Sequence, residues 1–168
     1  MKVFIIAAST LDGFIAQFPN QKSTKWTSQQ DFQHFIKITQ QAGVVILGRV
    51  TYDTIGKPLK NRLNIVLTSR PQPSKFSNLV YTHDSPQKIL ADLKKQGHQN
   101  IAICGGASIY SLFLDNNLID EIYLTLEPIF FGQGISLFSK PCHQKLKLLD
   151  CQKANSQGTL FLHYQVLK

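Results

Sequence analysis

Hydroxyl and basic side chains follow two apolar segments that read as parallel strands, a pattern typical of a site for phosphate groups. The two segments are Val44–Leu47 and Leu63–Leu67. Anions bind at helix N-termini beyond the carboxyl ends of strands, and guanidinium groups bind phosphate with paired hydrogen bonds. The candidate residues are Gly48, Arg49, Thr51, Thr68, Ser69 and Arg70. Arginines with hydroxyl groups suit the 2′-phosphate of NADPH, so the pattern favours NADPH over NADH.

A second strand-to-helix turn carries paired glycines. Gly105 and Gly106 follow the apolar run Ile101–Cys104 and precede a segment with helical character. Glycine lets a backbone approach a ligand closely, and a helix N-terminus offers free N–H groups. A Gly-Gly turn alone is weak evidence for phosphate binding. We interpret Cys104 as a packing residue rather than a nucleophile.

Asp31 is the carboxylate whose position could support acid–base chemistry. Asp31, Phe35, Ile38 and Ala42 follow helical spacing, so the acid shares a stripe with apolar side chains. Ser28 is the candidate N-cap of this helix. A buried carboxylate has a raised pKa and can favour protonation of a substrate nitrogen. An acid that faces water and favours the helix dipole is the alternative interpretation.

Several motifs resemble the dihydrofolate reductase family, over almost the whole chain. Trp26 precedes Asp31 by five residues and Phe35 lies one turn further on, as in that family. The Gly48-Arg49-Val50-Thr51 turn resembles its cofactor turn, and Ile55-Gly56-Lys57-Pro58-Leu59 with Arg62 resembles its substrate border. The resemblance implies reduction of dihydrofolate by NADPH, with a role in tetrahydrofolate biosynthesis and one-carbon metabolism.

The resemblance also assigns roles to residues. Asp31 would hold the pterin, with Trp26 and Thr125 as its catalytic partners. The substrate would further contact Ile6, Ala8, Phe35, Ile55, Leu59 and Arg62, with Arg62 binding the carboxylate of a glutamyl tail. Besides the residues that follow the segments Val44–Leu47 and Leu63–Leu67, the cofactor would contact Ala8, Ile15, Cys104, Gly105, Gly106, Ala107, Ser108, Ile109 and Tyr110. No metal is implied.

Other motifs resemble the riboflavin-pathway pyrimidine reductases of the wider superfamily. These are the opening Ala8–Ala16 and the segment Pro128–Phe138. The Asp-Asp-Pro-x-Leu motif common in those enzymes is not found after the Gly48-Arg49 turn. A 5-amino-6-(5-phosphoribosylamino)uracil reductase-like enzyme, in which Arg62 binds a phosphate, is therefore the alternative. A non-catalytic NADPH-binding module is a third interpretation.

Composition is consistent with one globular domain spanning residues 1–168. The chain is 43% hydrophobic and 17% charged, with a formal net charge of +8. The lysines are dispersed, so the charge favours small anionic molecules, a pterin or pyrimidine, over nucleic acid. Three cysteines without metal-type spacing suggest reduced thiols in a cytoplasmic protein. No stretch has the length of a membrane helix, and the protein is expected to be a monomer or homodimer.

The order of apolar segments predicts an α/β fold, and the resemblance implies a three-layer fold of the dihydrofolate reductase type. Its central sheet would be mostly parallel, with an antiparallel C-terminal edge formed by a hairpin around Asn155–Gly158. We expect strands near residues 2–8, 44–48, 63–68, 78–81, 101–104, 120–127, 144–152 and 158–166. We expect helices near residues 28–41, 51–56, 85–96 and 107–115. The loop of residues 16–26 would close over the cofactor.

Overall fold

Helices alternate with strands along most of the chain in the computed structural model, which describes residues 1–168. The strands are β1 (Lys2–Thr10), β2 (Phe14–Ala16), β3 (Gly43–Gly48), β4 (Leu63–Leu67), β5 (Leu79–Thr82), β6 (Asn100–Ile103), β7 (Glu121–Glu127), β8 (Ile135–Ser136), β9 (Leu146–Lys153) and β10 (Leu160–Val166). The helices are the 3-10 turn η1 (Ser23–Lys25), α1 (Gln29–Ala42), α2 (Arg49–Ile55), α3 (Pro86–Lys95) and α4 (Ala107–Asp115).

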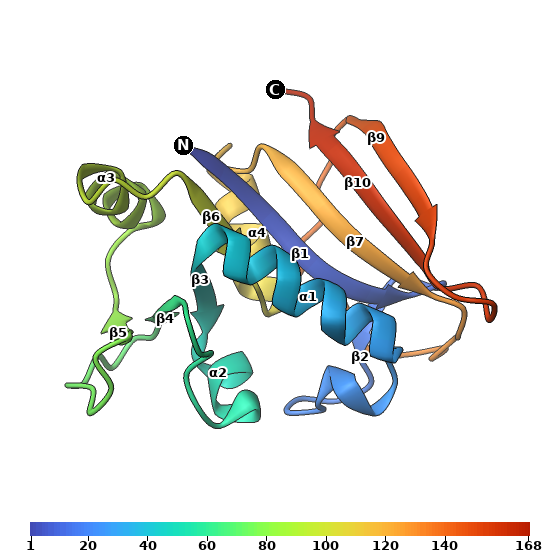
Figure 1. Cartoon of the computed structure of the whole chain (residues 1–168), viewed down its shortest axis with the longest axis horizontal. Coiled ribbons are helices and arrows are strands. Elements are labelled where there is room, and N and C mark those ends of the chain that lie inside the picture. The colour runs from blue at the N-terminus through green and yellow to red at the C-terminus, as the bar shows by residue number, and fades with distance from the viewer.

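Eight strands form one sheet in the order β5-β4-β3-β6-β1-β7-β10-β9 (Figure 1). In this sheet the neighbouring strands β5, β4, β3, β6, β1 and β7 are parallel, whereas β10 runs antiparallel to both β7 and β9. This confirms the predicted mostly parallel sheet with an antiparallel C-terminal edge. The carboxyl ends of the parallel strands meet at one edge, where the phosphate-type turns were expected.

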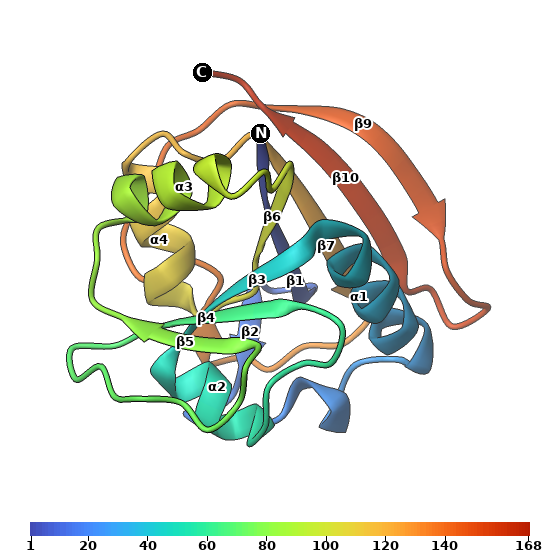
Figure 2. The same ribbon diagram turned by 60° about the vertical axis from the view of Figure 1, so that its left-hand side comes forward.

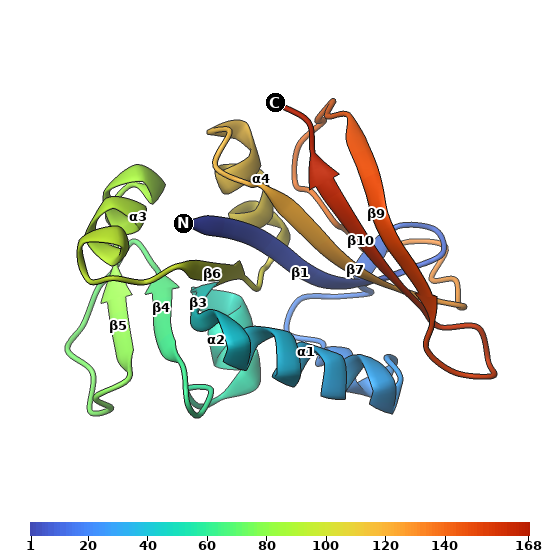
Figure 3. The same ribbon diagram turned by 45° about the horizontal axis from the view of Figure 1, so that its top comes forward.

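Two hydrophobic cores lie on opposite faces of the sheet. Along β1, Val3 and Ile5 face the core beneath α3 and α4, whereas Phe4 and Ile6 face the core beneath α1 and α2. This alternation follows from the two-residue period of a strand, and it explains why the central strands are apolar at every position. Figure 2 and Figure 3 show the resulting three layers, with α1 and α2 on one face and α3 and α4 on the other.

The predicted hairpin joins β9 to β10. Asn155 starts its turn, Gly158 adopts a φ of +106°, and the Ala154 N–H donates to the Thr159 carbonyl at 2.8 Å. The β9 strand is the exposed edge of the sheet. None of the helices combines the length and apolar character that a membrane crossing requires.

A small second ribbon, β2 paired with β8, was not predicted from the sequence. The carboxylate of Asp12 accepts the backbone N–H groups of Phe131 at 3.1 Å and Gly132 at 2.7 Å, which ties the two loops together. Gly134 lies so close to Ala16 that a Cβ would stand 2.3 Å from its carbonyl oxygen. In the same segment Phe130 is 71% exposed, so it does not belong to the core.

Candidate active site

Asp31 lies in the first turn of α1 and is only 9% exposed. Ser28 is the N-cap of the helix, as predicted, and its hydroxyl accepts the Asp31 N–H at 3.2 Å. The stripe of Asp31, Phe35, Ile38 and Ala42 faces the sheet, where Ala42 is buried and the aromatic and aliphatic side chains join the core beneath α1. The interpretation of Asp31 as a solvent-facing helix acid is therefore wrong.

Burial raises the pKa of the Asp31 carboxyl above its ordinary value of 3.8. The hydroxyl of Thr125 opposes this rise because it favours the charged form, although no formed hydrogen bond joins it to Asp31, and the negative charge of Glu127 reinforces the rise. The Thr27 hydroxyl acts in the same direction as Thr125, although its geometry falls short of a formed hydrogen bond. Asp31 is thus a carboxyl group that retains a proton more readily than a free aspartate.

Strand β7 supplies the groups around this carboxyl. Thr125 is 2% exposed and lies beside Ala8 of β1 in the parallel register. Alternation along β7 places Glu127 on the same face as Thr125, and Glu127 is 3% exposed. Asp31, Thr125 and Glu127 therefore gather at the carboxyl end of the sheet.

Two buried polar atoms beside Asp31 have no hydrogen-bond partner in the protein. They are the indole Nε1 of Trp26 and the hydroxyl of Thr27. The Trp26 ring packs edge-to-face on Phe131, with ring centroids 5.2 Å apart. Because buried donors and acceptors are normally satisfied, these atoms indicate a place for a bound water or ligand group.

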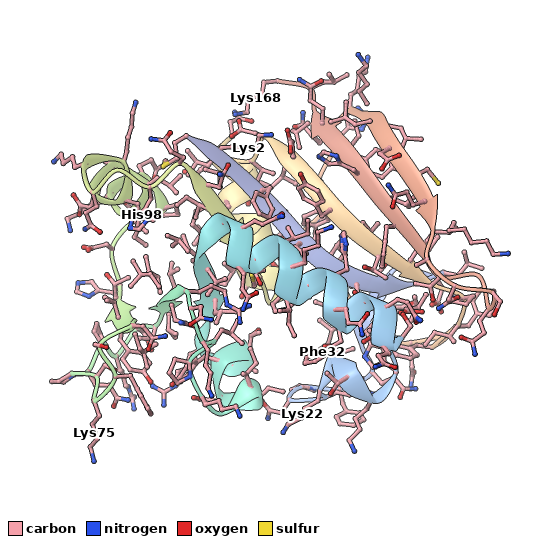
Figure 4. All side chains as sticks on the ribbon, in the orientation of Figure 1. Lys2, Lys22, Phe32, Lys75, His98 and Lys168 are labelled. Carbon is pink, nitrogen blue, oxygen red and sulfur yellow. The ribbon has the colours of Figure 1, made fainter.

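Apolar side chains of α1, α2 and β1 form the wall next to Asp31. Ile6 is buried in the core beneath α1, against which the predicted substrate residues Phe35, Ile55 and Leu59 pack. Phe32, one residue after Asp31, is 48% exposed. Figure 4 shows it on the side of α1 toward α2 and the loop that carries Lys22.

The loop of residues 16–26 reaches α2. The hydroxyl of Thr54 donates to the Val50 carbonyl at 2.8 Å and lies 3.5 Å from the side-chain oxygen of Asn20, a contact between the loop and the helix that carries Arg49. Within the loop the Gln17 N–H donates to the side chain of Gln21 at 2.6 Å. The loop therefore connects the start of α1 with the last turn of α2.

The two predicted cofactor turns form one continuous surface. The Gly48 N–H donates to the Gly105 carbonyl at 2.6 Å, and the Gly105–Gly106 peptide is cis. A Cβ on Gly48 would stand 2.9 Å from Ile109 Cγ1, and one on Gly106 would stand 3.3 Å from the Thr51 hydroxyl. Glycines at these two positions therefore allow the two turns of this cradle to pack closely.

The first turn of α4 offers backbone rather than side chains to the cradle. No side chain caps this helix, and its residues Ala107 and Ile109 are buried whereas Ser108 is exposed. The Tyr110 hydroxyl donates to the Ile6 carbonyl at 2.9 Å, which joins the helix to β1. Burial raises the pKa of Tyr110 well above its ordinary value, so its hydroxyl stays protonated.

Arg49 lies at the start of α2 beside aromatic rings. Its Nε donates to both carboxylate oxygens of Asp53, at 2.9 and 2.8 Å, and its guanidinium lies 5.5 Å from the centroid of the Tyr81 ring. At the end of the neighbouring strand, the Thr68 hydroxyl accepts the Arg70 N–H at 3.2 Å. The remaining predicted residue of this strand end, Ser69, is exposed.

Arg62 is 7% exposed and forms no ion pair with a carboxylate of the protein. Its Nη1 donates to the Thr39 hydroxyl at 2.6 Å and its Nε donates to the Lys60 carbonyl at 2.9 Å. Burial lowers the pKa of its guanidinium. The alternative of a structural salt bridge at Arg62 is therefore wrong, and this buried cation retains unused N–H groups.

Two predicted cofactor residues, Ile15 and Cys104, pack in or against the hydrophobic cores. Ile15 packs against the core beneath α3 and α4, on the face of the sheet opposite to Asp31. Cys104 is buried, and burial raises the pKa of its thiol, which fits a packing residue. Sequence reasoning missed Glu127, Thr27 and Phe32. The two-residue alternation through Tyr123 and Thr125 could have indicated Glu127.

A family model described as dihydrofolate reductase matches residues 2–132. An uncharacterized protein of Bacillus subtilis, YwjB, is 28% identical over 171 residues, which cover 97% of this chain and 97% of that protein. The dihydrofolate reductase of Buchnera aphidicola is 27% identical and covers 100% of this chain and 98% of its own.

Among solved structures, a Thermotoga maritima protein superimposes with a TM-score of 0.76 at 20% identity. It is a diaminohydroxyphosphoribosylaminopyrimidine deaminase/5-amino-6-(5-phosphoribosylamino)uracil reductase, and the match covers 99% of this chain and 56% of that one. This similarity supports the fold alone. Given the family match over most of its length, the chain belongs to the dihydrofolate reductase family.

Proposed function

We propose that the protein is an oxidoreductase that reduces a C=N bond of a pterin, with 7,8-dihydrofolate as substrate and tetrahydrofolate as product. The observation that carries the proposal is the environment of Asp31. It is the buried carboxyl group at the end of an apolar wall, with a raised pKa and two unpartnered polar atoms beside it. Family membership supports the same reaction class.

The cradle fits NADPH as the cofactor. Gly48, Gly105 and Gly106 let the two turns pack closely together, and α4 begins there with an uncapped N-terminus whose free N–H groups suit a phosphate. Arg49 and Arg70 would hold the 2′-phosphate, which requires the Arg49 guanidinium to share its donors with Asp53. When bound, NADPH supplies the hydride for the reduction.

Asp31 would supply the acid–base function of the site. Its carboxyl would hold the amino-pyrimidine edge of the pterin and favour a proton on the nitrogen of the C=N bond. Thr125 would orient that carboxyl, and the Trp26 indole N–H would hold a water molecule or a substrate oxygen. The apolar wall of Ile6, Ala8 and Phe35 would exclude other water.

Arg62 would bind an anionic tail of the substrate. Its guanidinium is buried without a carboxylate partner, and an uncompensated buried cation is costly. A substrate carboxylate would supply the missing charge. The loop of residues 16–26, already in contact with α2 through Asn20, would act as the lid.

The test is a spectrophotometric assay of NADPH oxidation by the purified protein with dihydrofolate, with and without an antifolate. Dihydrofolate-dependent oxidation that the antifolate inhibits supports the proposal. NADPH binding without oxidation, at any dihydrofolate concentration up to saturation, would overturn it in favour of a ribosylated aminopyrimidine substrate, and the absence of turnover with every candidate substrate would leave a non-catalytic NADPH-binding module.

The fold shared with the Thermotoga protein makes a ribosylated aminopyrimidine the second candidate substrate, with Arg62 as a phosphate ligand. Arg62→Ala separates the two. A folate reductase should lose about 2 kcal/mol or more of binding free energy for dihydrofolate, and far less for a pterin without a tail, because only the tail contacts the guanidinium. Equal losses for both pterins, measured as KM values, would contradict a tail-binding role.

A further inference from the structure

Glu127 is a buried carboxylate that neither the sequence motifs nor the proposed reaction uses. It is 3% exposed at the end of β7, two residues after Thr125. A buried acid is costly unless hydrogen bonds satisfy it, so its environment demands an explanation. Its contacts lead directly to the helix that carries Asp31.

Two donors hold the Glu127 carboxylate in a fixed orientation. Oε1 accepts the backbone N–H of Ser28 at 2.7 Å, and Oε2 accepts the hydroxyl of Thr159 at 2.7 Å. Thr159 is itself held by Asn155, whose side-chain amide donates to its hydroxyl at 2.9 Å. The carboxylate therefore cannot turn away toward solvent.

The same contacts place the charge of Glu127 at the N-terminus of the helix that carries Asp31. Ser28 is bonded on one side to Glu127 through its N–H, and on the other to the Asp31 N–H through its hydroxyl. A negative charge near a second carboxyl disfavours ionisation of that carboxyl. The other titratable group whose charge is coupled to Asp31 is Tyr110 of α4, which stays neutral at physiological pH.

We propose that Glu127 is a positioning residue for the reduction, whose locked negative charge acts on the Asp31 carboxyl from across Ser28. This proposal rests on the proposed function for its catalytic meaning, but the interaction between the two carboxylates is independent of any substrate. Glu127 touches neither substrate nor cofactor in this role. It acts through Asp31 alone.

Two variants distinguish this role from simple support of the helix. Glu127→Gln keeps an oxygen that accepts the Ser28 N–H but removes the charge. Glu127→Asp keeps the charge but shortens the reach to Ser28. If the charge matters, the Gln variant should ionise Asp31 at lower pH and the Asp variant should resemble the wild type. If Glu127 only anchors the helix, the pattern should be reversed.

The primary measurement is an NMR titration of the Asp31 carboxyl carbon in the ligand-free protein and in both variants. The proposal expects the Asp31 titration to move to lower pH in Glu127→Gln, and the alkaline limb of the pH–rate profile to move with it. The rate at pH 8 should then fall several-fold while NADPH affinity is unchanged.

An unchanged Asp31 titration in Glu127→Gln would overturn the proposal. If that variant does not fold, Glu127→Asp decides alone: an Asp31 titration like that of the wild type supports the charge role, and a displaced one refutes it. Failure of the proposed function has a different signature. In that case the wild type would not reduce dihydrofolate, although the NMR titration would still move when the Glu127 charge is removed.

Discussion

At the scale of single residues, the burial of Asp31 that suits its proposed role also lowers the stability of the fold at high pH. Burial raises its pKa, so the folded protein binds this proton more tightly than the unfolded chain does. The contribution of Asp31 to stability is therefore fully present below pH 3.8, its ordinary pKa, and is lost as the pH rises through the higher folded pKa. Ionisation of the buried carboxyl at higher pH therefore destabilises the fold.

Asp31→Asn should therefore have opposite effects on activity and stability. Turnover should fall by about 10²- to 10⁴-fold because the acid–base group is lost, while NADPH affinity is retained. The melting temperature at pH 7 should rise by a few degrees, and the gain should disappear below pH 4. Calorimetry across pH measures this, with the exposed Asp115→Asn as the matched control. A lower melting temperature at pH 7 would contradict the buried-charge argument.

The motif residues could be predicted from the sequence because their spacing is local. Trp26, Asp31 and Phe35 lie within one helix and its entry, so helical periodicity alone places the acid on an apolar stripe. Glu127 could not be found in this way. Its partner Ser28 is 99 residues distant in sequence, and only the folded sheet brings them together.

At the scale of elements, β7 connects the site to the middle of the sheet. Glu121 at its start receives a hydrogen bond from Lys2 of β1 at 2.7 Å and contacts His163 of β10 at 2.9 Å. Burial acts to raise the pKa of Glu121, but the hydrogen bonds from Lys2 and His163 outweigh it and the pKa is lowered. The side chain thus links three adjacent strands.

Glu121→Gln should destabilise the protein by about 2 kcal/mol, because hydrogen bonds to a charged group are lost. Since the folded pKa is lowered, this stability is present above pH 4.5, the ordinary value, and is lost as the pH falls through the folded pKa. Urea unfolding at pH 7 and pH 3 should show a larger difference at pH 7. Lys2→Ala should cost less, because His163 still pairs with Glu121. Equal stability of Glu121→Gln and wild type at pH 7 would refute the role.

The elements that sequence reasoning located are those with a long periodic pattern. The apolar runs predicted β3 and β6, and the capping residue Ser28 predicted the start of α1. The ribbon of β2 and β8 was missed because its strands have only three and two residues, too few for a period. Its pairing depends on Asp12, a side chain that no local pattern connects to residues 131 and 132.

At the scale of the whole molecule, the order of the elements predicted the architecture because right-handed crossovers leave few alternatives. Helices separate most of the strands up to β7, although β4 and β5 follow one another directly, and this order favours a parallel sheet with helices on both faces. The final hairpin then adds the antiparallel edge. The assignment of side chains such as Ile15 to the core beneath α3 and α4 needed the structure, since Ile15 lies in the short ribbon.

The three free cysteines differ in exposure, so the reactivity of their thiols can report local opening of the folded protein. Cys142 and Cys151 are exposed, whereas Cys104 is buried one residue before the glycine cradle, and burial raises the pKa of its thiol. An aromatic disulfide reagent should therefore modify two thiols promptly and the third only during excursions that separate the central strands. The slow phase measures the free energy of those excursions, without any assay of catalysis. A ligand seated in the cradle should lengthen the slow phase by a factor of 1 + L/Kd, where L is the free ligand concentration.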